Sequence, residues 1–186
     1  MPACRPDGES SSEMAHVTFI TGGARSGKSA YAQLLAERCQ GSLLYVATAG
    51  IGDSEMADRV RRHRAARGER WQTLEEPLAL ADRLPATADG KGGILLDCVT
   101  LWLCNLLFHH DECESMVWPE VERFIALLPA LPAPLFLVTN EIGAGIVPEN
   151  RLSRQFRDLA GEVNQRLAAV ADEAWLVVSG LPVRLK

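Results

Sequence analysis

A run of eight residues near the N-terminus has the residue types and spacing of a loop that binds phosphate groups. It reads GGARSGKS and fits the pattern G-x-x-x-x-G-K-[ST]. Glycines allow backbone N–H groups to converge on phosphate oxygens, and a following helix adds the positive end of its dipole. We expect Lys28 to reach the β- and γ-phosphates of a nucleoside triphosphate and the Ser29 hydroxyl to hold Mg²⁺. This phosphate-binding loop consists of Gly22, Gly23, Ala24, Arg25, Ser26, Gly27, Lys28 and Ser29.

The sequence on either side of the loop supports this interpretation over a simple glycine-rich turn. Residues 16–23 form an apolar stretch that predicts a strand running into the loop. Residues 28–39 predict a helix that begins inside it. A strand before the motif and a helix after it are the context in which this motif binds nucleotides.

A second candidate residue, Asp97, ends the apolar run ILLD. A carboxylate at such a position resembles the Walker B residue that orients Mg²⁺ through water. The alternative is that Asp97 caps a helix beginning at 98–100. The carboxyl end of a strand is the ligand-binding edge of a parallel sheet, which favours the nucleotide site.

The third candidate is His63, which lies in the arginine-rich segment DSEMADRVRRHRAAR. On composition alone, a surface helix with a charged face and a structural histidine is the more frequent outcome. The chemical alternative is that nearby positive charge disfavours imidazolium and keeps His63 neutral and nucleophilic. Arginines also suit phosphate, whose charge must be neutralised before a nucleophile attacks it.

These candidates need a scaffold, and the rest of the chain alternates predicted strands with predicted helices. Uniformly apolar strands between helices predict an α/β fold: one mostly parallel sheet, covered by helices on both faces, with ligands at the carboxyl ends of the strands. The glycine-rich loop 143–148 is either a mobile lid or a structural turn. Besides 16–23, the predicted strands are 42–49, 92–99, 134–141 and 174–180, with a short extended piece at 71–76. Besides 28–39, helices are predicted from 53 or 54 to about 67, from after 99 to about 108, at 117–128 and at 151–171, with an acidic loop at 109–116.

Length and composition exclude several classes of protein. The chain has 186 residues, of which 47% are hydrophobic, which suggests one domain with a sizeable core. A net charge of −5 argues against a general nucleic-acid binder. Apolar runs of about 8–9 residues are far short of the roughly 20 that a membrane-spanning helix needs. The five cysteines, an odd number without CxxC spacing, indicate reduced thiols in a cytoplasmic protein.

The first 14 residues differ from the remainder. They are polar and lack the basic-then-apolar order of a signal peptide. We predict that residues 1–14 are a disordered extension, or that Met14 is the true start, and that residues 15–186 form one domain.

Six motifs, taken in order, resemble one enzyme family. They are GGARSGKS, LYVATA, DxEMxxRVxxHRxxR, WxTLEEP, ILLDCVTLWxxNLL and LVTNEIGAGIVPENRLSRxFRD. Together they resemble adenosylcobinamide kinase/adenosylcobinamide-phosphate guanylyltransferase, a bifunctional family of cobalamin biosynthesis. The resemblance covers about residues 15–186 and is most specific from Val138 to Gly180.

The resemblance implies two reactions in a RecA-like P-loop fold. ATP or GTP phosphorylates adenosylcobinamide, and GTP then donates GMP to adenosylcobinamide phosphate through a GMP–histidine. The matching histidine is His63, so His63 and Lys28 are the implied catalytic residues. Mg²⁺ accompanies the nucleotide, no tightly bound organic cofactor is implied, and family members tend to form trimers.

The resemblance also implies nucleotide contacts beyond the phosphate-binding loop. Asp97 is glutamate in some relatives, and its role is open between the ribose hydroxyls and Mg²⁺. The implied contacts are Ala47, Thr48, Ala49, Arg64, Ala65, Ala66, Arg67, Glu75 and Asp97.

Two other functions are compatible with a phosphate-binding loop. An ordinary small-molecule kinase needs only Lys28, Ser29 and a carboxylate, but it leaves the arginines around His63 unexplained. A GTP-binding switch usually reads guanine with an N-K-x-D motif, which this chain lacks. The nearest string, residues 140–143, has neither the lysine nor the aspartate.

Overall fold

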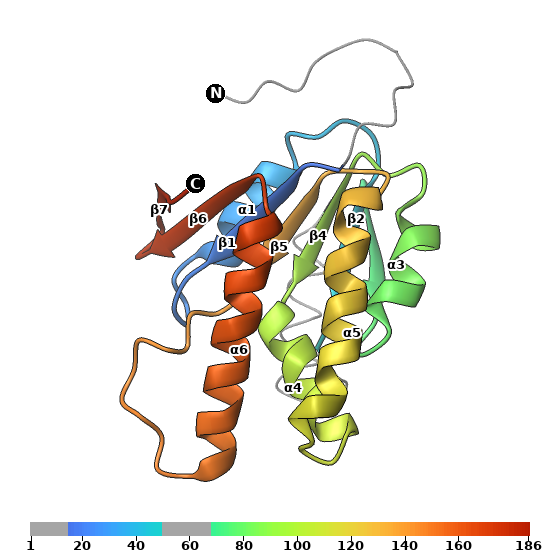
Figure 1. Ribbon diagram of the computed structural model, residues 1–186. Coiled ribbons are helices and arrows are strands. Elements are labelled where there is room, and N and C mark those ends of the chain that lie inside the picture. The colour runs from blue at the N-terminus through green and yellow to red at the C-terminus, as the bar shows by residue number, and fades with distance from the viewer. Residues whose placement is uncertain (1–14, 50–67) are drawn as a thin grey trace.

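A seven-stranded sheet forms the centre of the protein (Figure 1). The computed structural model describes residues 15–49 and 68–186; the predicted helix at 53–67 and the predicted extension at 1–14 lie outside them. The strands lie in the order β3-β2-β4-β5-β1-β6-β7, and β1 to β6 are parallel while β7 runs antiparallel to β6. Their bounds are β1 Val17–Thr21, β2 Leu43–Ala47, β3 Trp71–Glu75, β4 Gly93–Asp97, β5 Leu135–Val138, β6 Glu173–Val178 and β7 Leu181–Arg184.

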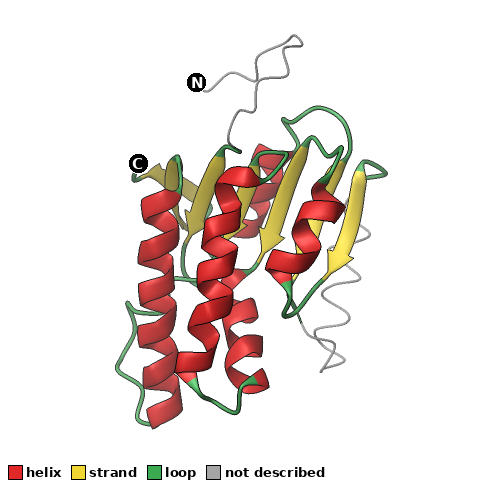
Figure 2. Cartoon of the chain, turned by 45° about the vertical axis from the view of Figure 1, so that its right-hand side comes forward, coloured by secondary structure: helices red, strands yellow, loops and turns green. Residues whose placement is uncertain are grey.

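Helices cover both faces of the sheet (Figures 1 and 2). Helix α1 lies on one face, and α3, α4, α5 and α6 lie on the other. This arrangement confirms the predicted α/β fold with a mostly parallel sheet. The bounds are α1 Lys28–Ala36, α3 Leu80–Ala88, α4 Val99–His109, α5 Glu114–Leu127 and α6 Arg151–Val170, with a 3₁₀ turn, η1, at Leu128–Ala130.

The core consists of two layers because successive side chains of a strand point to opposite faces of the sheet. In β1, Phe19 packs in the layer under α4 to α6, whereas Ile20 packs in the layer under α1. Trp102 of α4 and Phe124 of α5 are among the largest fully buried side chains, and their ring centroids lie 5.1 Å apart. The sheet is thus packed on both faces, and the carboxyl ends of its parallel strands lie at one edge.

Two elements were missed by the sequence reasoning and one was bounded wrongly. Helix α3 was missed because Pro85 interrupts its sequence pattern, although Leu80, Leu84 and Ala88 are buried at a spacing of four residues. Helix α5 begins at Glu114, inside the predicted loop 109–116. A Pro within its first two turns does not prevent the helix from starting earlier.

Strand β7 is the second missed element, so the predicted strand 174–180 is not the last one. Ser179 and Gly180 have φ angles of 51° and 81°, which make a two-residue turn between β6 and β7. Such turns need positive φ at both positions and join antiparallel strands. The Ser-Gly pair was therefore the available signal for a hairpin at the C-terminus.

Candidate functional site

The phosphate-binding loop lies where the sequence predicts it, between the end of β1 and the start of α1. Gly27 is the N-cap of α1 and no side chain caps this helix, so its first N–H groups face the loop. The Lys28 side chain is buried, and its Nζ donates a hydrogen bond to the Gly23 carbonyl oxygen at 3.0 Å. The ammonium is thus held inside the loop that is predicted to bind phosphates.

Two glycines allow the hairpin of β6 and β7 to pack closely against the phosphate-binding loop. A Cβ on Gly22 would lie 2.4 Å from the carbonyl oxygen of Val177. A Cβ on Gly27, whose φ is 95°, would lie 3.1 Å from the Cα of Gly180. In addition, the Gly180 N–H donates to the Ser26 carbonyl oxygen at 2.8 Å. These glycines therefore serve close backbone packing as well as the loop conformation.

Three predicted site residues lie in one row across neighbouring strands. Ala47 of β2 is paired in register with Glu75 of β3 on one side and Asp97 of β4 on the other. The Tyr45 hydroxyl donates to Asp97 Oδ2 at 3.2 Å. Asp97 does not cap α4, because the N-cap of that helix is Cys98 and no side chain caps it. The alternative prediction for Asp97 is therefore wrong.

Lys28 and Asp97 form the charged centre of the site. Burial lowers the pKa of Lys28, and the negative charge of Asp97 opposes this effect. Burial, followed by the charge of Asp97, raises the pKa of the Cys98 thiol to about 11. Cys98 is therefore uncharged at neutral pH, and Lys28 and Asp97 are the charged side chains near it.

Helix α4 anchors the ends of β2 and β3. The Thr48 hydroxyl donates to the Cys98 carbonyl at 2.7 Å and accepts from the Cys98 N–H at 2.8 Å. Asn105 Nδ2 donates to the carbonyl oxygens of Thr48, at 2.7 Å, and Pro77, at 3.2 Å. The Trp102 indole N–H donates to the Leu78 carbonyl at 2.8 Å. The predicted contact residue Thr48 is fully buried, and its hydroxyl is used within the protein.

Two hydroxyl groups next to the phosphate-binding loop have no hydrogen-bond partner in the described part of the chain. They are Thr21 Oγ1, at the end of β1, and Ser26 Oγ, inside the loop. Buried polar atoms in native proteins are nearly always paired, so unpaired ones call for an explanation. Both oxygens are enclosed by protein atoms, one at the end of β1 and one inside the loop.

The structure brings part of the predicted site together at one edge of the sheet. Residues 22–29, 47–49, Glu75 and Asp97 all lie at the carboxyl ends of parallel strands. The remaining predicted residues lie outside the described residues: His63, Arg64, Ala65, Ala66 and Arg67. The segment that contains them connects the end of β2 to the start of β3.

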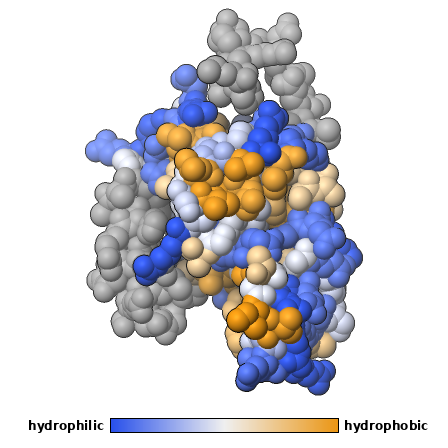
Figure 3. All heavy atoms as spheres, turned by 90° about the vertical axis from the view of Figure 1, so that its left-hand side faces the viewer, coloured by the Kyte–Doolittle hydropathy of each residue, from blue (hydrophilic) through white to orange (hydrophobic). Residues whose placement is uncertain are grey.

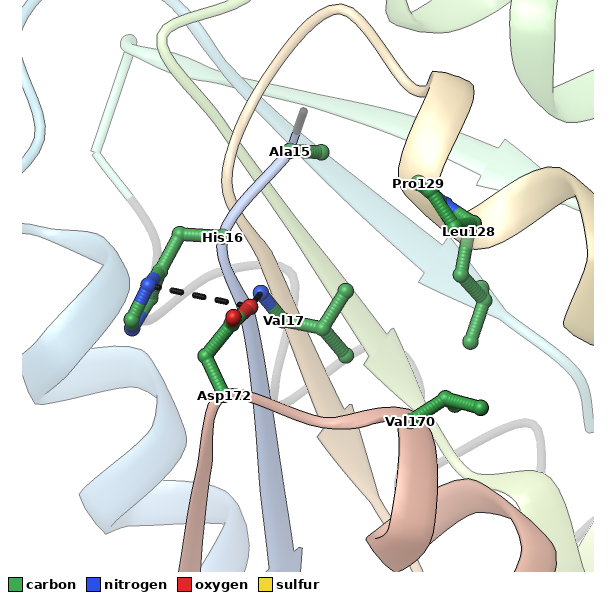
Figure 4. Close-up of a pocket in the computed structure, with 7 residues that line it drawn as sticks. All are labelled: Ala15, His16, Val17, Leu128, Pro129, Val170 and Asp172. Atoms are coloured by element: carbon green, nitrogen blue, oxygen red, sulfur yellow. Dashed lines mark hydrogen bonds and ion pairs between the residues drawn. The ribbon is translucent and has the colours of Figure 1, made fainter. Parts of the chain in front are cut away.

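A cavity of about 430 Å³ lies at the opposite edge of the sheet (Figure 4). It is lined by Ala15, His16 and Asp172, which precede β1 and β6. Asp172 Oδ2 accepts from the Val17 N–H at 2.7 Å and lies 3.8 Å from His16 Nδ1. Ligands of parallel α/β sheets bind at the carboxyl ends of the strands, so this cavity is not the nucleotide site.

Residues 15–49 and 68–186 lack two features that would indicate other functions. None of their helices is both long and apolar enough to cross a bilayer. They also contain no group of three or more His, Cys, Asp or Glu side chains that could hold a metal ion. Mg²⁺ usually takes one or two protein carboxylates together with substrate phosphates, and it needs no such group.

Sequence reasoning missed several residues around the site. It did not identify Tyr45 as the partner of Asp97, nor the hairpin behind the loop. It also missed the anchors Trp102 and Asn105, although both occur in the motif ILLDCVTLWxxNLL. The available signal was the spacing of Asn105 from Cys98, since residues seven apart lie on the same face of a helix.

A phosphate-binding loop after the first strand, with a buried lysine in the loop and a carboxylate at the end of β4, defines a P-loop nucleotide-binding enzyme. Residues 18–185 match the model of the family described as cobinamide kinase / cobinamide phosphate guanyltransferase. The chain belongs to this family, whose members are enzymes of adenosylcobalamin biosynthesis.

Similar proteins have been identified in three bacteria. The bifunctional adenosylcobalamin biosynthesis protein CobU of Escherichia coli is 46% identical over 180 residues, covering 90% of this chain and 98% of that protein. CobU of Salmonella typhimurium is 46% identical over 184 residues, with the same coverage. The corresponding protein CobP of Pseudomonas aeruginosa is 45% identical over 168 residues, covering 90% and 96%.

Proposed function

We propose that this chain catalyses two successive transfers on one substrate. First, it phosphorylates the aminopropanol hydroxyl of adenosylcobinamide with ATP or GTP. Second, it transfers GMP from GTP to the resulting adenosylcobinamide phosphate, which gives adenosylcobinamide-GDP and pyrophosphate. The observation that carries the proposal is the buried Lys28 in the phosphate-binding loop, with Asp97 at the carboxyl end of β4, in a chain that matches this family from residue 18 to 185.

In the first reaction the substrate hydroxyl oxygen forms a bond to the γ-phosphorus. The bond between that phosphorus and the β-phosphate oxygen breaks, the hydroxyl proton leaves and a nucleoside diphosphate is released. Lys28 neutralises the charge on the terminal phosphates, and the N–H groups at the start of α1 donate to them. The Lys28 ammonium has three donors, of which one is used on the Gly23 carbonyl, so the others are available to phosphate oxygens.

In the second reaction a nitrogen of neutral His63 forms a bond to the α-phosphorus of GTP. The bond to the β-phosphate oxygen breaks and pyrophosphate leaves. A phosphate oxygen of adenosylcobinamide phosphate then attacks the same phosphorus, and the P–N bond breaks to regenerate His63. Two displacements through a covalent intermediate replace one difficult step with two easier ones.

Mg²⁺ fits the donors present at the loop. The Ser29 hydroxyl and the Asp97 carboxylate are oxygen ligands of the kind that Mg²⁺ prefers. When bound, the ion would neutralise charge on the phosphate oxygens. Asp97 also lies in register with Ala47 and Glu75, so a ribose hydroxyl is the alternative partner for its carboxylate.

A labelling experiment separates this function from the two alternatives. The protein is incubated with GTP labelled in the α-phosphate and is then denatured, with γ-labelled GTP as the matched control. We expect α-label to remain on the protein, stable in base and labile in acid, because a phosphoramidate has these properties. An ordinary kinase or a GTP-binding switch would leave no label on the denatured chain.

We further propose that the enzyme is a homo-oligomer, and a trimer by its resemblance to the family. Support comes from β7, which is an edge strand and leaves a row of backbone groups unpaired within the described sheet. Figure 3 shows hydrophobic side chains gathered on the side of the molecule where this edge lies. Those that are at least half exposed near the edge are Val178, Leu181, Val183 and Leu185.

The mass in solution tests the oligomer. Light scattering should give three times the 20.3 kDa of the chain. Val183→Lys should shift the protein towards monomer, because it places a charge in the apolar edge. Val170→Lys is the matched control, since Val170 is an exposed valine on α6. A monomeric wild type would contradict the proposal.

The cellular location and the binding partners of the enzyme are also proposals. We propose that it works in the cytoplasm, because the cysteines Cys39, Cys98, Cys104 and Cys113 are all free thiols. Its proposed partners are adenosylcobinamide, adenosylcobinamide phosphate, GTP and ATP. Neither a nucleic acid nor a membrane is among them, since the net charge of −5 disfavours both.

A further inference from the structure

A closed ring of hydrogen bonds surrounds the backbone of Asn140, directly after β5. The Asn140 N–H donates to Thr100 Oγ1 at 2.8 Å, and the Asn140 carbonyl accepts from Asn164 Nδ2 at 3.2 Å. Thr100 Oγ1 lies 3.1 Å from Thr139 Oγ1, which donates to Asn164 Oδ1 at 2.8 Å. The side chains of Thr100, Thr139 and Asn164 are buried.

The direction of every bond in this ring follows from the number of donors. A hydroxyl has one proton, and that of Thr139 is used on Asn164. Thr100 must therefore donate to Thr139, while it accepts from the Asn140 N–H. The chain of donors starts at the Asn140 N–H and returns to the Asn140 carbonyl. Such a fully satisfied buried network rigidifies the residue it encloses.

The chain beyond β5 is also tied to the phosphate-binding loop. The Thr139 N–H donates to the Ile20 carbonyl at 3.0 Å, and the Glu141 N–H donates to the Gly22 carbonyl at 3.0 Å. These two bonds continue the parallel ladder between β5 and β1 up to the first residue of the loop. The position of Asn140 is thus set by the ring on one side and by the loop on the other.

Strand alternation places the side chain of Asn140 on the face of the sheet that carries α1. Val138 packs in the layer under α1, and Thr139 belongs to the ring on the opposite face. Asn140 therefore lies on the same face as Val138, whose partner in register is Asp97. Helix α1 begins on this face with Lys28. The Asn140 carboxamide makes no hydrogen bond to any of the described residues and is only half-buried.

We propose that the Asn140 carboxamide donates a hydrogen bond to the terminal phosphate of the nucleotide, and that Thr100, Thr139 and Asn164 are the positioning residues that hold it there. The proposal rests on the proposed phosphoryl transfer. A neutral amide donor between Lys28 and Asp97 contacts phosphate oxygens without adding to the charge of either group. The ring supplies the rigidity that makes such a donor effective, because a pre-organised donor needs no rearrangement during the reaction.

Binding of nucleotides tests the contact without relying on turnover. In wild type, the affinity for a non-hydrolysable nucleoside triphosphate is compared with that for the diphosphate by calorimetry. Asn140→Ala should lower the preference for the triphosphate about 10- to 100-fold, the factor expected for one hydrogen bond to a charged group. Asn140→Asp keeps the size of the side chain but places a negative charge beside the phosphate, so it should lower the preference for the triphosphate further. An unchanged preference in both variants would overturn the proposal.

Kinase turnover tests the ring. Thr139→Val removes the hydroxyl that links Thr100 to Asn164, and we expect kcat to fall several-fold while KM for the nucleotide changes little. Thr139→Ser restores the hydroxyl and should restore kcat. Thr18→Val is the matched control, because Thr18 is a buried threonine near the amino end of β1. A ring with a purely structural role would lower Tm in Thr139→Val but leave kcat at the wild-type value, and this result would overturn the positioning role.

The two proposals fail in different ways. If wild type shows no phosphorylation of adenosylcobinamide, the proposed function is wrong. If wild type is active and Asn140→Ala matches it in both kcat and triphosphate preference, the function stands and the role of Asn140 is wrong.

Discussion

The carboxyl edge of the sheet has two halves that use their polar atoms differently. At the end of β2, the Thr48 hydroxyl is paired twice with Cys98, and Asn105 binds the carbonyls of Thr48 and Pro77. At the end of β1, the hydroxyls of Thr21 and Ser26 are buried without a partner within the described residues. The β2 half pairs its buried polar atoms within the protein, whereas the β1 half keeps two buried hydroxyls without a partner among the described residues.

Both halves are nevertheless attached to the same helix. Thr100 of α4 holds Asn140 beside the phosphate-binding loop, while Trp102 and Asn105 of α4 hold the ends of β2 and β3. The segment 50–67, which carries His63, starts from the β2 half and returns to β3. We therefore infer that the β1 half governs the γ-phosphate and that the β2 half governs guanylyl transfer.

Lys28→Ala should have the largest effect. Removing the only lysine of the loop should lower kinase turnover at least about 100- to 1,000-fold, because it deletes a pre-organised charge on the terminal phosphates. Nucleotide binding should weaken severely as well. Phosphorylation assays and calorimetry measure both effects, and Lys91→Ala, outside the loop, is the control. Near-normal turnover in a folded Lys28→Ala protein would refute the role of the loop.

Asp97→Ala should impair both reactions, because Asp97 lies between the two halves. We expect each rate to fall about 10- to 100-fold, the range for losing a hydrogen bond to a charged group. Asp97→Glu keeps the carboxylate and should retain part of each activity. Parallel kinase and guanylyl transfer assays measure the two rates in each variant. If alanine is tolerated in both, the carboxylate contributes to neither reaction.

Asn105→Asp should separate the two halves. The change keeps the shape but removes the amide donors, and leaving the two carbonyls without a partner costs about 1–3 kcal/mol. We expect guanylyl transfer to fall several-fold more than kinase activity. Thr139→Val breaks the ring that includes Thr100 of α4, and it should lower kinase activity more than guanylyl transfer. Equal losses of both activities in each variant would mean that the edge acts as one unit.

Cysteine alkylation should have the smallest effect. The pKa of Cys98 is raised to about 11 by burial, so the thiol form predominates at pH 8. Among the cysteines of the described residues, Cys113 is exposed and should react before Cys98. Alkylation at pH 8, mapped by mass spectrometry, should therefore modify Cys113, spare Cys98 and leave both activities unchanged. Reactivity of Cys98 should appear only as the pH rises towards 11.

The sequence predicts the parts of the site that depend on local pattern. The phosphate-binding loop and α6 were predicted nearly to the residue, because a glycine-rich motif and a helix of 20 residues have strong local signals. The position of Asp97 at the carboxyl end of β4 was also predictable, since it ends an apolar run.

Contacts between segments distant in sequence were not predictable. The ring around Asn140 joins residues 100, 139, 140 and 164, which no local pattern relates to one another. The same is true of the support that Gly180 gives to Ser26, across about 150 residues of chain. Such pairings follow only from the order of the strands, which periodicity does not specify.

The central claim is that one chain carries two separable transfers, with His63 serving only the second. The most direct measurement maps the label from α-labelled GTP in wild type and in His63→Ala, under conditions that preserve P–N bonds, alongside kinase assays of both proteins. We predict that the GMP lies on the peptide containing His63, and that His63→Ala loses the adduct while it still phosphorylates adenosylcobinamide. A label on another residue, or an adduct that persists in His63→Ala, would contradict the claim.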